Sequence, residues 1–99
     1  MKAKITYQFV ATIWQYTGPT GWHFVSLPRH ITSEIRESLK FQEEGWGRMK
    51  ATARIGQTEW ETAIWFDTQH HTYLLPLKAA IRKKEALELN QPIQVTIGI

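Results

Sequence analysis

Tryptophan is the residue type in this chain with the clearest capacity for ligand chemistry. Five tryptophans occur among 99 residues, and an indole ring can either pack in a core or form the flat wall of a binding site. Trp60 falls in the inward-facing row of its predicted strand. Three others lie outside such a row or in a glycine-flanked turn: Trp14, Trp46 and Trp65. These three either form a second layer under the helices or line a ligand cleft or partner interface.

Basic residues form the second group of candidates. The net charge is +3, from twelve basic and nine acidic side chains, and this surplus is small for a nucleic-acid-binding protein. The candidates for phosphate contacts are Arg48, Lys50, Arg54, Lys78, Arg82 and Lys83. In the expected hairpin register, Arg54 faces Glu59, and Glu61 lies diagonal to Lys50 and Arg54. We therefore expect a solvated face of mixed charge, with nucleic-acid binding as the alternative hypothesis.

The residue pattern does not predict an enzyme, a cofactor or a metal site. Cysteine is absent, so the chain has no thiol nucleophile and no cysteine zinc site. His70-His71 lies near Asp67, but adjacent residues of an extended chain point apart and rarely hold one ion alone. The serines lack a nucleophile elbow, and no glycine-rich phosphate loop occurs. The histidine pair is therefore interpreted as an exposed polar turn.

Length and hydropathy indicate one domain over residues 1–99. The N-terminal segment contains no apolar signal region, and no apolar run approaches the roughly 18 residues of a membrane span. The expectation is a cytoplasmic protein without a membrane partner.

Period-two alternation of apolar residues predicts that most of the chain is β-strand. The expected strands are 5–13, 22–27, 48–55, 59–66, 73–77 and 93–99. Between two of them, Gly56-Gln57 predicts a type II′ turn. The resulting register places Ala53 opposite Trp60 and Met49 opposite Ile64.

Two segments have helical rather than alternating spacing. The first contains Ile31, Ile35 and Leu39, with Thr32 or Ser33 as its N-cap. The second runs from Lys78 to about Leu87. A Leu-Pro pair precedes each helix, at 27–28 and 75–76, which indicates an internal duplication. The predicted fold class is therefore mainly β: a closed or split six-stranded β-barrel with two short capping helices.

A series of short motifs resembles the family known as domain of unknown function 1905. The motifs are Phe9-x-Ala11, Trp22-x-Phe24-Val25-x-Leu27-Pro28, Gly45-x-Gly47-Arg48, Ile55-Gly56-x-x-x-Trp60 and Tyr73-Leu74-Leu75-Pro76-Leu77-Lys78-x-x-Ile81-Arg82-Lys83. The resemblance implies a closed or split barrel with helical caps, and it supplies no catalytic residues. The family usually has Gly-Asp before the last strand, where this chain has Asn90-Gln91. Because asparagine tolerates a left-handed backbone, we expect the turn to survive without the carboxylate.

The segment from Leu75-Pro76 to Ile97 is also similar to the swapped-hairpin barrels of transition-state regulators and antitoxin antidotes, which bind DNA as dimers. A shared shape does not carry function with it. The first functional hypothesis is a non-catalytic module that binds a small ligand or a protein at an aromatic cleft or barrel end. The alternative is a nucleic-acid-binding domain.

Overall fold

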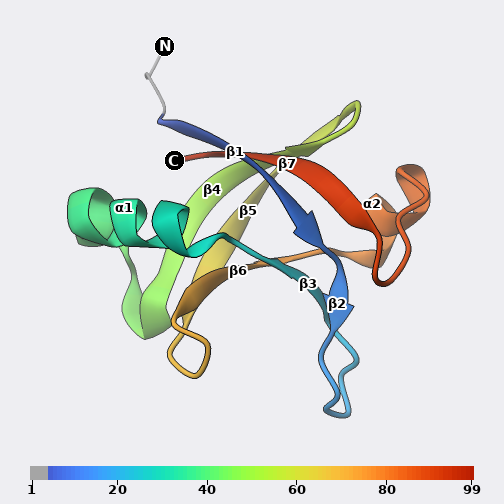
Figure 1. The fold of residues 1–99 in the computed structure, drawn as a ribbon, viewed down its shortest axis with the longest axis horizontal. Helices are drawn as coiled ribbons and strands as arrows, with labels where there is room; N and C mark the ends of the chain where they lie inside the picture. The colour runs from blue at the N-terminus through green and yellow to red at the C-terminus, as the bar shows by residue number, and fades with distance from the viewer. Residues whose placement is uncertain (1–4) are drawn as a thin grey trace.

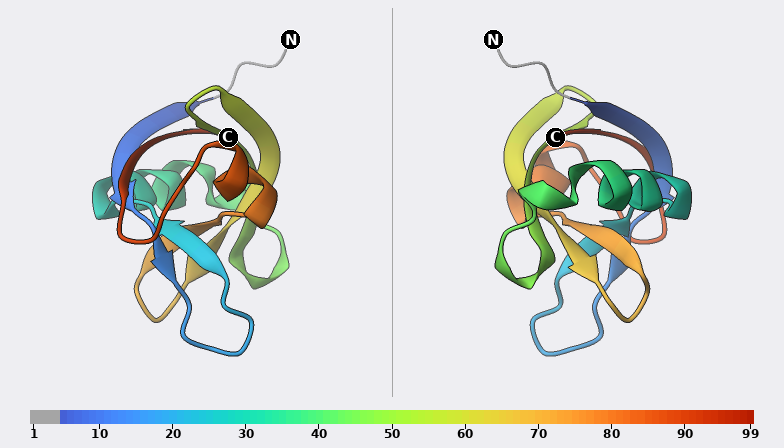
Figure 2. Two further views of the ribbon diagram at one scale, coloured as in Figure 1. Left: turned by 90° about the vertical axis from the view of Figure 1, so that its right-hand side faces the viewer. Right: turned by 90° about the vertical axis from the view of Figure 1, so that its left-hand side faces the viewer.

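A single antiparallel sheet of seven strands curls around the core in the computed structural model, which describes residues 5–99 (Figure 1). The strands are β1 (Thr6–Thr12), β2 (Trp14–Gln15), β3 (His23–Ser26), β4 (Arg48–Ile55), β5 (Thr58–Asp67), β6 (Thr72–Pro76) and β7 (Pro92–Gly98). The helices are α1 (Arg29–Leu39) and α2 (Ala79–Lys84), and two 3-10 turns follow α1: η1 (Lys40–Gln42) and η2 (Gly45–Gly47). The predicted mainly β class with two short helices is confirmed. Figures 1 and 2 place the two helices at opposite ends of the sheet.

The strand order is β1-β7-β4-β5-β6-β3-β2, so the first two strands of the chain lie at the two ends of the order. Only Ile13 separates β1 from β2. Its N–H donates to the carbonyl of Gln91 at 3.1 Å, and its carbonyl accepts from the N–H of Asn90 at 2.8 Å. The predicted strand 5–13 therefore continues into a second short strand with a different partner. This is why the described sheet has seven strands where six were expected.

The strand pairings relate the two halves of the chain to each other. We compare β1 to β4 with β5 to β7, taking β1 and β2 together as the counterpart of β5. The pairing of β1 with β7 then corresponds to that of β5 with β4, and β2 with β3 to β5 with β6. In the two remaining pairings of the described chain, β3 with β6 and β4 with β7, each strand pairs with its own counterpart in the other half. This topology agrees with the two similar halves predicted from the Leu-Pro repeat.

The core consists of the inward-facing rows of the strands together with one face of α1. Its strand residues include Tyr7, Phe9, Met49, Ala51, Ala53, Ile55, Ile64, Tyr73, Leu75, Ile93, Val95 and Ile97, and Ile13 between β1 and β2 also belongs to it. The predicted β4–β5 register is confirmed, because Ala53 pairs with Trp60 and Met49 with Ile64. Gly56 has φ 58°, as the first loop residue of a type II′ turn requires.

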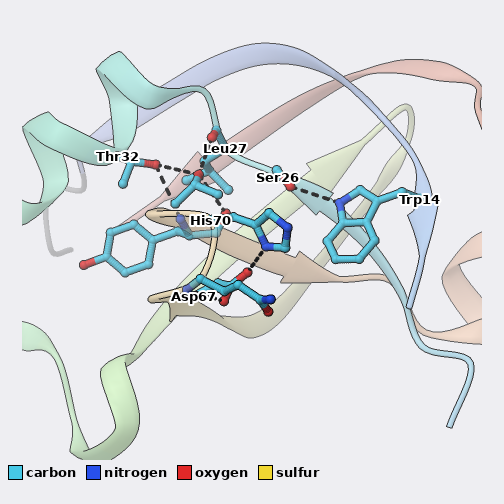
Figure 3. A network of polar contacts seen from close by, with 9 residues as sticks. Trp14, Ser26, Leu27, Thr32, Asp67 and His70 are labelled. Carbon is cyan, nitrogen blue, oxygen red and sulfur yellow. Dashed lines mark hydrogen bonds and ion pairs between the residues drawn. The ribbon is translucent and has the colours of Figure 1, made fainter. Parts of the chain in front are cut away.

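Two polar networks attach α1 and the turns after it to the sheet. In the first, the Thr72 hydroxyl donates its one proton to the carbonyl of Leu27 at 2.5 Å (Figure 3). The buried Thr32 hydroxyl is therefore the donor in its hydrogen bond to Thr72, at 3.0 Å. Thr32 therefore does not cap the helix as predicted. The helix begins three residues earlier, at Arg29, with no side-chain cap. Because the Thr32 hydroxyl lies inside the protein, its hydrogen bond to β6 fixes the position of the first turn of α1.

The second network joins Arg36, Glu43 and Tyr73. The Arg36 guanidinium donates to Glu43 Oε2 at 2.9 Å, and the Tyr73 hydroxyl donates to the same oxygen at 2.5 Å. Arg36 also lies over the ring of Phe66, with 3.9 Å from the guanidinium carbon to the ring centroid. Burial, and next the hydrogen bond to Glu43, raise the pKa of Tyr73 well above its ordinary value. The phenol therefore stays protonated and keeps donating to Glu43.

Helix α2 is shorter than predicted, ending at Lys84 instead of about Leu87. The chain leaves the helix through Ala86, which has φ 53°. The N–H of Leu87 bonds the carbonyl of Arg82 at 2.8 Å, and the N–H of Ala86 bonds that of Lys83 at 3.3 Å. These are the two bonds of a Schellman motif, in which glycine normally occupies the left-handed position. Asn90 has φ 64°, so the prediction that asparagine supports the next turn is confirmed.

Replacing Ala86 with glycine is expected to raise the free energy of unfolding by about 0.5–1 kcal/mol. The gain is the relief of left-handed strain at a side chain with a Cβ, less the extra backbone entropy that glycine loses on folding. Urea denaturation followed by tryptophan fluorescence measures it. Ala80→Gly, inside the same helix, is the control and should lower stability by about 0.5–1 kcal/mol. A loss of stability in both variants would contradict the assigned cap.

Candidate ligand-binding cleft

Two clefts contain residues from the sequence hypotheses, and the larger of these two has a volume of about 1360 Å³. Its walls come from the loop before β3, the strands β4 and β5, and the chain from the end of β6 into α2. Short contributions come from η1 and the C-terminal end of β7. The cleft therefore collects residues from both halves of the sequence.

Basic side chains enter this cleft from several elements. Arg48 and Lys50 come from β4, Lys78 immediately precedes α2, and Arg82 belongs to α2. Of the residues predicted for phosphate contact, only Arg54 and Lys83 are absent from the lining. Glu61 is the single acidic side chain among the lining residues, against the four basic ones, so positively charged side chains predominate.

Arg82 is held in place by two uncharged groups. Its Nε donates to the carbonyl of Leu77 at 3.2 Å, and its Nη1 lies 3.4 Å from His23 Nε2. Because a guanidinium can only donate, His23 Nε2 is the acceptor, which places the imidazole proton on Nδ1. That Nδ1 is buried and has no hydrogen-bond partner among the described residues. Arg82 is thus positioned without a carboxylate that would neutralise it.

The charged face of the β4–β5 hairpin is less neutralised than its register suggested. Arg54 does pair with Glu59 across the strands, as predicted. Its guanidinium, however, donates to the carbonyl of Gly56 at 3.3 Å, and no ion pair links β4 to β5 in the part of the chain that the structure describes. Arg48 pairs instead with Glu44, at 2.5 Å on the surface. The strand register places Arg54 opposite Glu59, but the two side chains do not form an ion pair.

The three tryptophans predicted for a ligand site do not share one cleft. Trp65 lines the larger cleft with 38% of its surface exposed, and its ring centroid lies 5.8 Å from the Arg48 guanidinium carbon. Trp14 lines the smaller cleft, and Trp46 lines neither. Trp46 is almost fully exposed and has φ 68°. Of the proposed trio, only Trp65 belongs to the larger cleft.

Trp22 is the aromatic residue that the sequence interpretation missed. It lines the larger cleft, is 53% exposed, and stacks on Phe24 with 6.1 Å between ring centroids. The signal was present, because Trp22 and Phe24 alternate with Val25 and Leu27, which are buried. Reading that strand as mostly apolar concealed its outward-facing aromatic row.

The smaller cleft, of about 530 Å³, lies where Trp14 and His70 approach each other. Trp14 Nε1 donates to Ser26 Oγ at 2.9 Å, and the Trp14 and His70 rings are 6.3 Å apart (Figure 3). His70 Nδ1 donates to Asp67. Burial raises the pKa of Asp67, but hydrogen bonds from His70 and from the backbone of Gln69 outweigh it and lower the pKa below its ordinary value. His70 is therefore oriented by a carboxylate that stays ionised at neutral pH.

Two further properties of residues 5–99 bear on function. No three His, Asp or Glu side chains come together there as a potential metal site. No helix in this part of the chain has the length and apolar character needed to cross a membrane.

These features define a small antiparallel β-domain with a helix at each end and a basic, tryptophan-containing cleft. Residues 9–97 match the family model described as a domain of unknown function (DUF1905). The match covers nearly the whole chain, and the protein belongs to this family. No curated protein matches the sequence.

Proposed function

We propose that this protein is a non-catalytic module that binds, in the larger cleft, an anionic ligand carrying a flat ring. The positioning of Arg82 is the observation that carries this proposal. Leu77 and His23 hold its guanidinium, and neither group cancels its charge. A guanidinium fixed in this way loses little side-chain entropy when it binds an anion, and it can offer paired donors to a phosphate or carboxylate.

The other cleft residues support the same ligand chemistry. Lys50 and Lys78 add positive charge and have no ion-pair partner among the described residues. The partly exposed ring of Trp65 offers an apolar surface for stacking beside them. A ligand with an anionic group and a planar ring would therefore satisfy both kinds of side chain at once.

Anilinonaphthalene sulfonate, which joins a sulfonate to planar rings, tests the proposal as a fluorescent probe. We expect saturable binding to the folded protein and a loss of about tenfold or more in affinity for Arg82→Gln, because hydrogen bonds to charged groups contribute about 1.5–3 kcal/mol. Trp65→Ala should also weaken binding. Circular dichroism of each variant shows whether it keeps the native fold.

Lys83→Gln is the matched control, because it removes the same charge from the adjacent position of α2 but lies outside the cleft lining. Trp46→Ala is the corresponding control for Trp65. The proposal fails if folded protein does not bind the dye, or if Lys83→Gln weakens binding as much as Arg82→Gln does.

A further inference from the structure

We propose that the ligand of the larger cleft is a single-stranded nucleic acid. This inference rests on the proposed function and names its ligand class. Aromatic and basic residues form two groups in the cleft, and the two groups come from separate parts of the fold.

One group, here the α2 station, consists of Trp22, His23, Lys78 and Arg82. Trp22 directly precedes His23, and His23 contacts Arg82 through its Nε2 atom. The Trp22 ring stacks on Phe24 on one side and is half-exposed. The α2 station thus combines a supported aromatic ring with a guanidinium and an ammonium group.

The second group, here the β4 station, consists of Arg48, Lys50 and Trp65. Arg48 pairs with Trp65 across the β4–β5 ladder, and its guanidinium lies near the indole ring. Figure 1 places α2 and the beginning of β4 toward opposite ends of the longest axis of the molecule. Both stations nevertheless line one continuous cleft. A tryptophan beside basic side chains therefore occurs twice along it. In the β4 station the charge of Arg48 is paired with Glu44, whereas Lys50 has no ion-pair partner among the described residues.

A ligand that fits both stations must itself repeat a planar ring and an anionic group. Single-stranded nucleic acid has this composition, with one base and one phosphate per nucleotide, and its bases are free to stack on tryptophan. In a duplex the base faces are already stacked on each other. The cleft volume of about 1360 Å³ also exceeds the roughly 300–1,000 Å³ of ordinary small-molecule pockets. The cleft volume and the repeated grouping together favour an oligonucleotide over a single small anion.

Fluorescence anisotropy with a labelled oligothymidylate of about eight nucleotides tests this inference. We expect binding that weakens with salt, with a slope of log K against log[salt] of about −0.7 for each phosphate contact. Lys50→Gln and Arg82→Gln, one in each station, should each make this slope shallower by about 0.7. Arg54→Gln and Lys83→Gln, on the same two elements but outside the lining, should leave the slope nearly unchanged.

Glu61 provides a variant that should gain affinity. Its carboxylate belongs to the lining and repels a passing phosphate, so Glu61→Gln should tighten oligonucleotide binding by about twofold to tenfold, as removal of a partly screened like charge predicts. An oligouridylate of the same length, a matched duplex and thymidine monophosphate complete the experiment. Either single strand should bind at least about tenfold more tightly than the duplex or the mononucleotide.

The result is read together with dye binding. If the dye binds at Arg82 but neither single strand binds, the nucleic-acid inference is wrong and the anionic-ligand proposal stands. Equal affinity for duplex and single strand, or for mononucleotide and oligonucleotide, would also overturn the inference. If neither dye nor oligonucleotide binds, both proposals fail.

Discussion

Glu43→Ala is expected to lower the free energy of unfolding by about 2–4 kcal/mol. The Glu43 carboxylate accepts hydrogen bonds from Arg36 and from the Tyr73 hydroxyl, and only 12% of its side chain is exposed. Alanine would leave a partly buried guanidinium and a buried phenol without their shared acceptor. Urea denaturation, followed by far-ultraviolet circular dichroism, measures the loss.

The adjacent glutamate supplies the matched control. Glu44 also pairs with an arginine, at 2.5 Å from Arg48, but 48% of its side chain is exposed. Because solvent screens such a pair, Glu44→Ala should cost no more than about 1 kcal/mol. Tyr73→Phe should lie between the two, at about 1–2 kcal/mol, since Arg36 and Glu43 remain paired. Equal losses for the two glutamate variants would show that burial does not control these ion pairs.

Ile13→Ala is expected to cost about 2–5 kcal/mol, the range for removing a large aliphatic side chain from a packed core. Ile13 is fully buried at the joint between β1 and β2. Its backbone bonds to Asn90 and Gln91 do not require the isoleucine side chain, so the loss should come from the cavity. Thermal unfolding and urea denaturation provide independent measurements.

The control for this position is Val10→Ala on β1, whose side chain is exposed and should cost no more than about 0.5 kcal/mol. Ile13→Val, which removes one methylene, should cost about 0.5–1.5 kcal/mol. If Ile13→Ala is as mild as Val10→Ala, the joint is not a closely packed part of the core.

Features of the fold that depend on neighbouring residues were predictable from sequence. The β4–β5 register follows from the two-residue turn at Gly56-Gln57 and the alternation on each side of it. The split at Ile13 was not predictable in this way. It arises because the residues before Ile13 pair with β7 and those after it with β3. Nothing in the local alternation records that change of partner.

The early end of α2 has a different cause. The prediction of a helix from Lys78 to about Leu87 rested on the helix-favouring residues Ala79, Ala80 and Ile81. Leu87, however, packs against the core. The chain turns at Ala86, which has a left-handed backbone conformation, immediately before Leu87. Tertiary contact outweighed local propensity at this residue.

The cleft was predicted in its parts but not as one site. Trp65 was assigned to a ligand hypothesis, whereas Lys50 and Arg82 were assigned to a competing nucleic-acid hypothesis. The fold brings all three residues to one cleft. Their proximity depends on how β4 and β5 lie relative to α2, which sequence spacing does not specify. The absence of an ion pair between Arg54 and Glu59 likewise depends on side-chain conformation, beyond strand register.

The position of β7 between β1 and β4 has a consequence for how the chain folds during synthesis. Thr6 pairs with Gly98, so the backbone of β1 forms its sheet hydrogen bonds only after β7, the last strand of the chain, has been synthesised. On a ribosome, the β4–β5 hairpin can form early because its pairing is local. The inward face of β1, including Tyr7 and Phe9, meanwhile lacks its β7 neighbour. Completion of the core is therefore a late, cooperative event, and a nascent chain paused before Pro92 would expose an unpaired apolar strand.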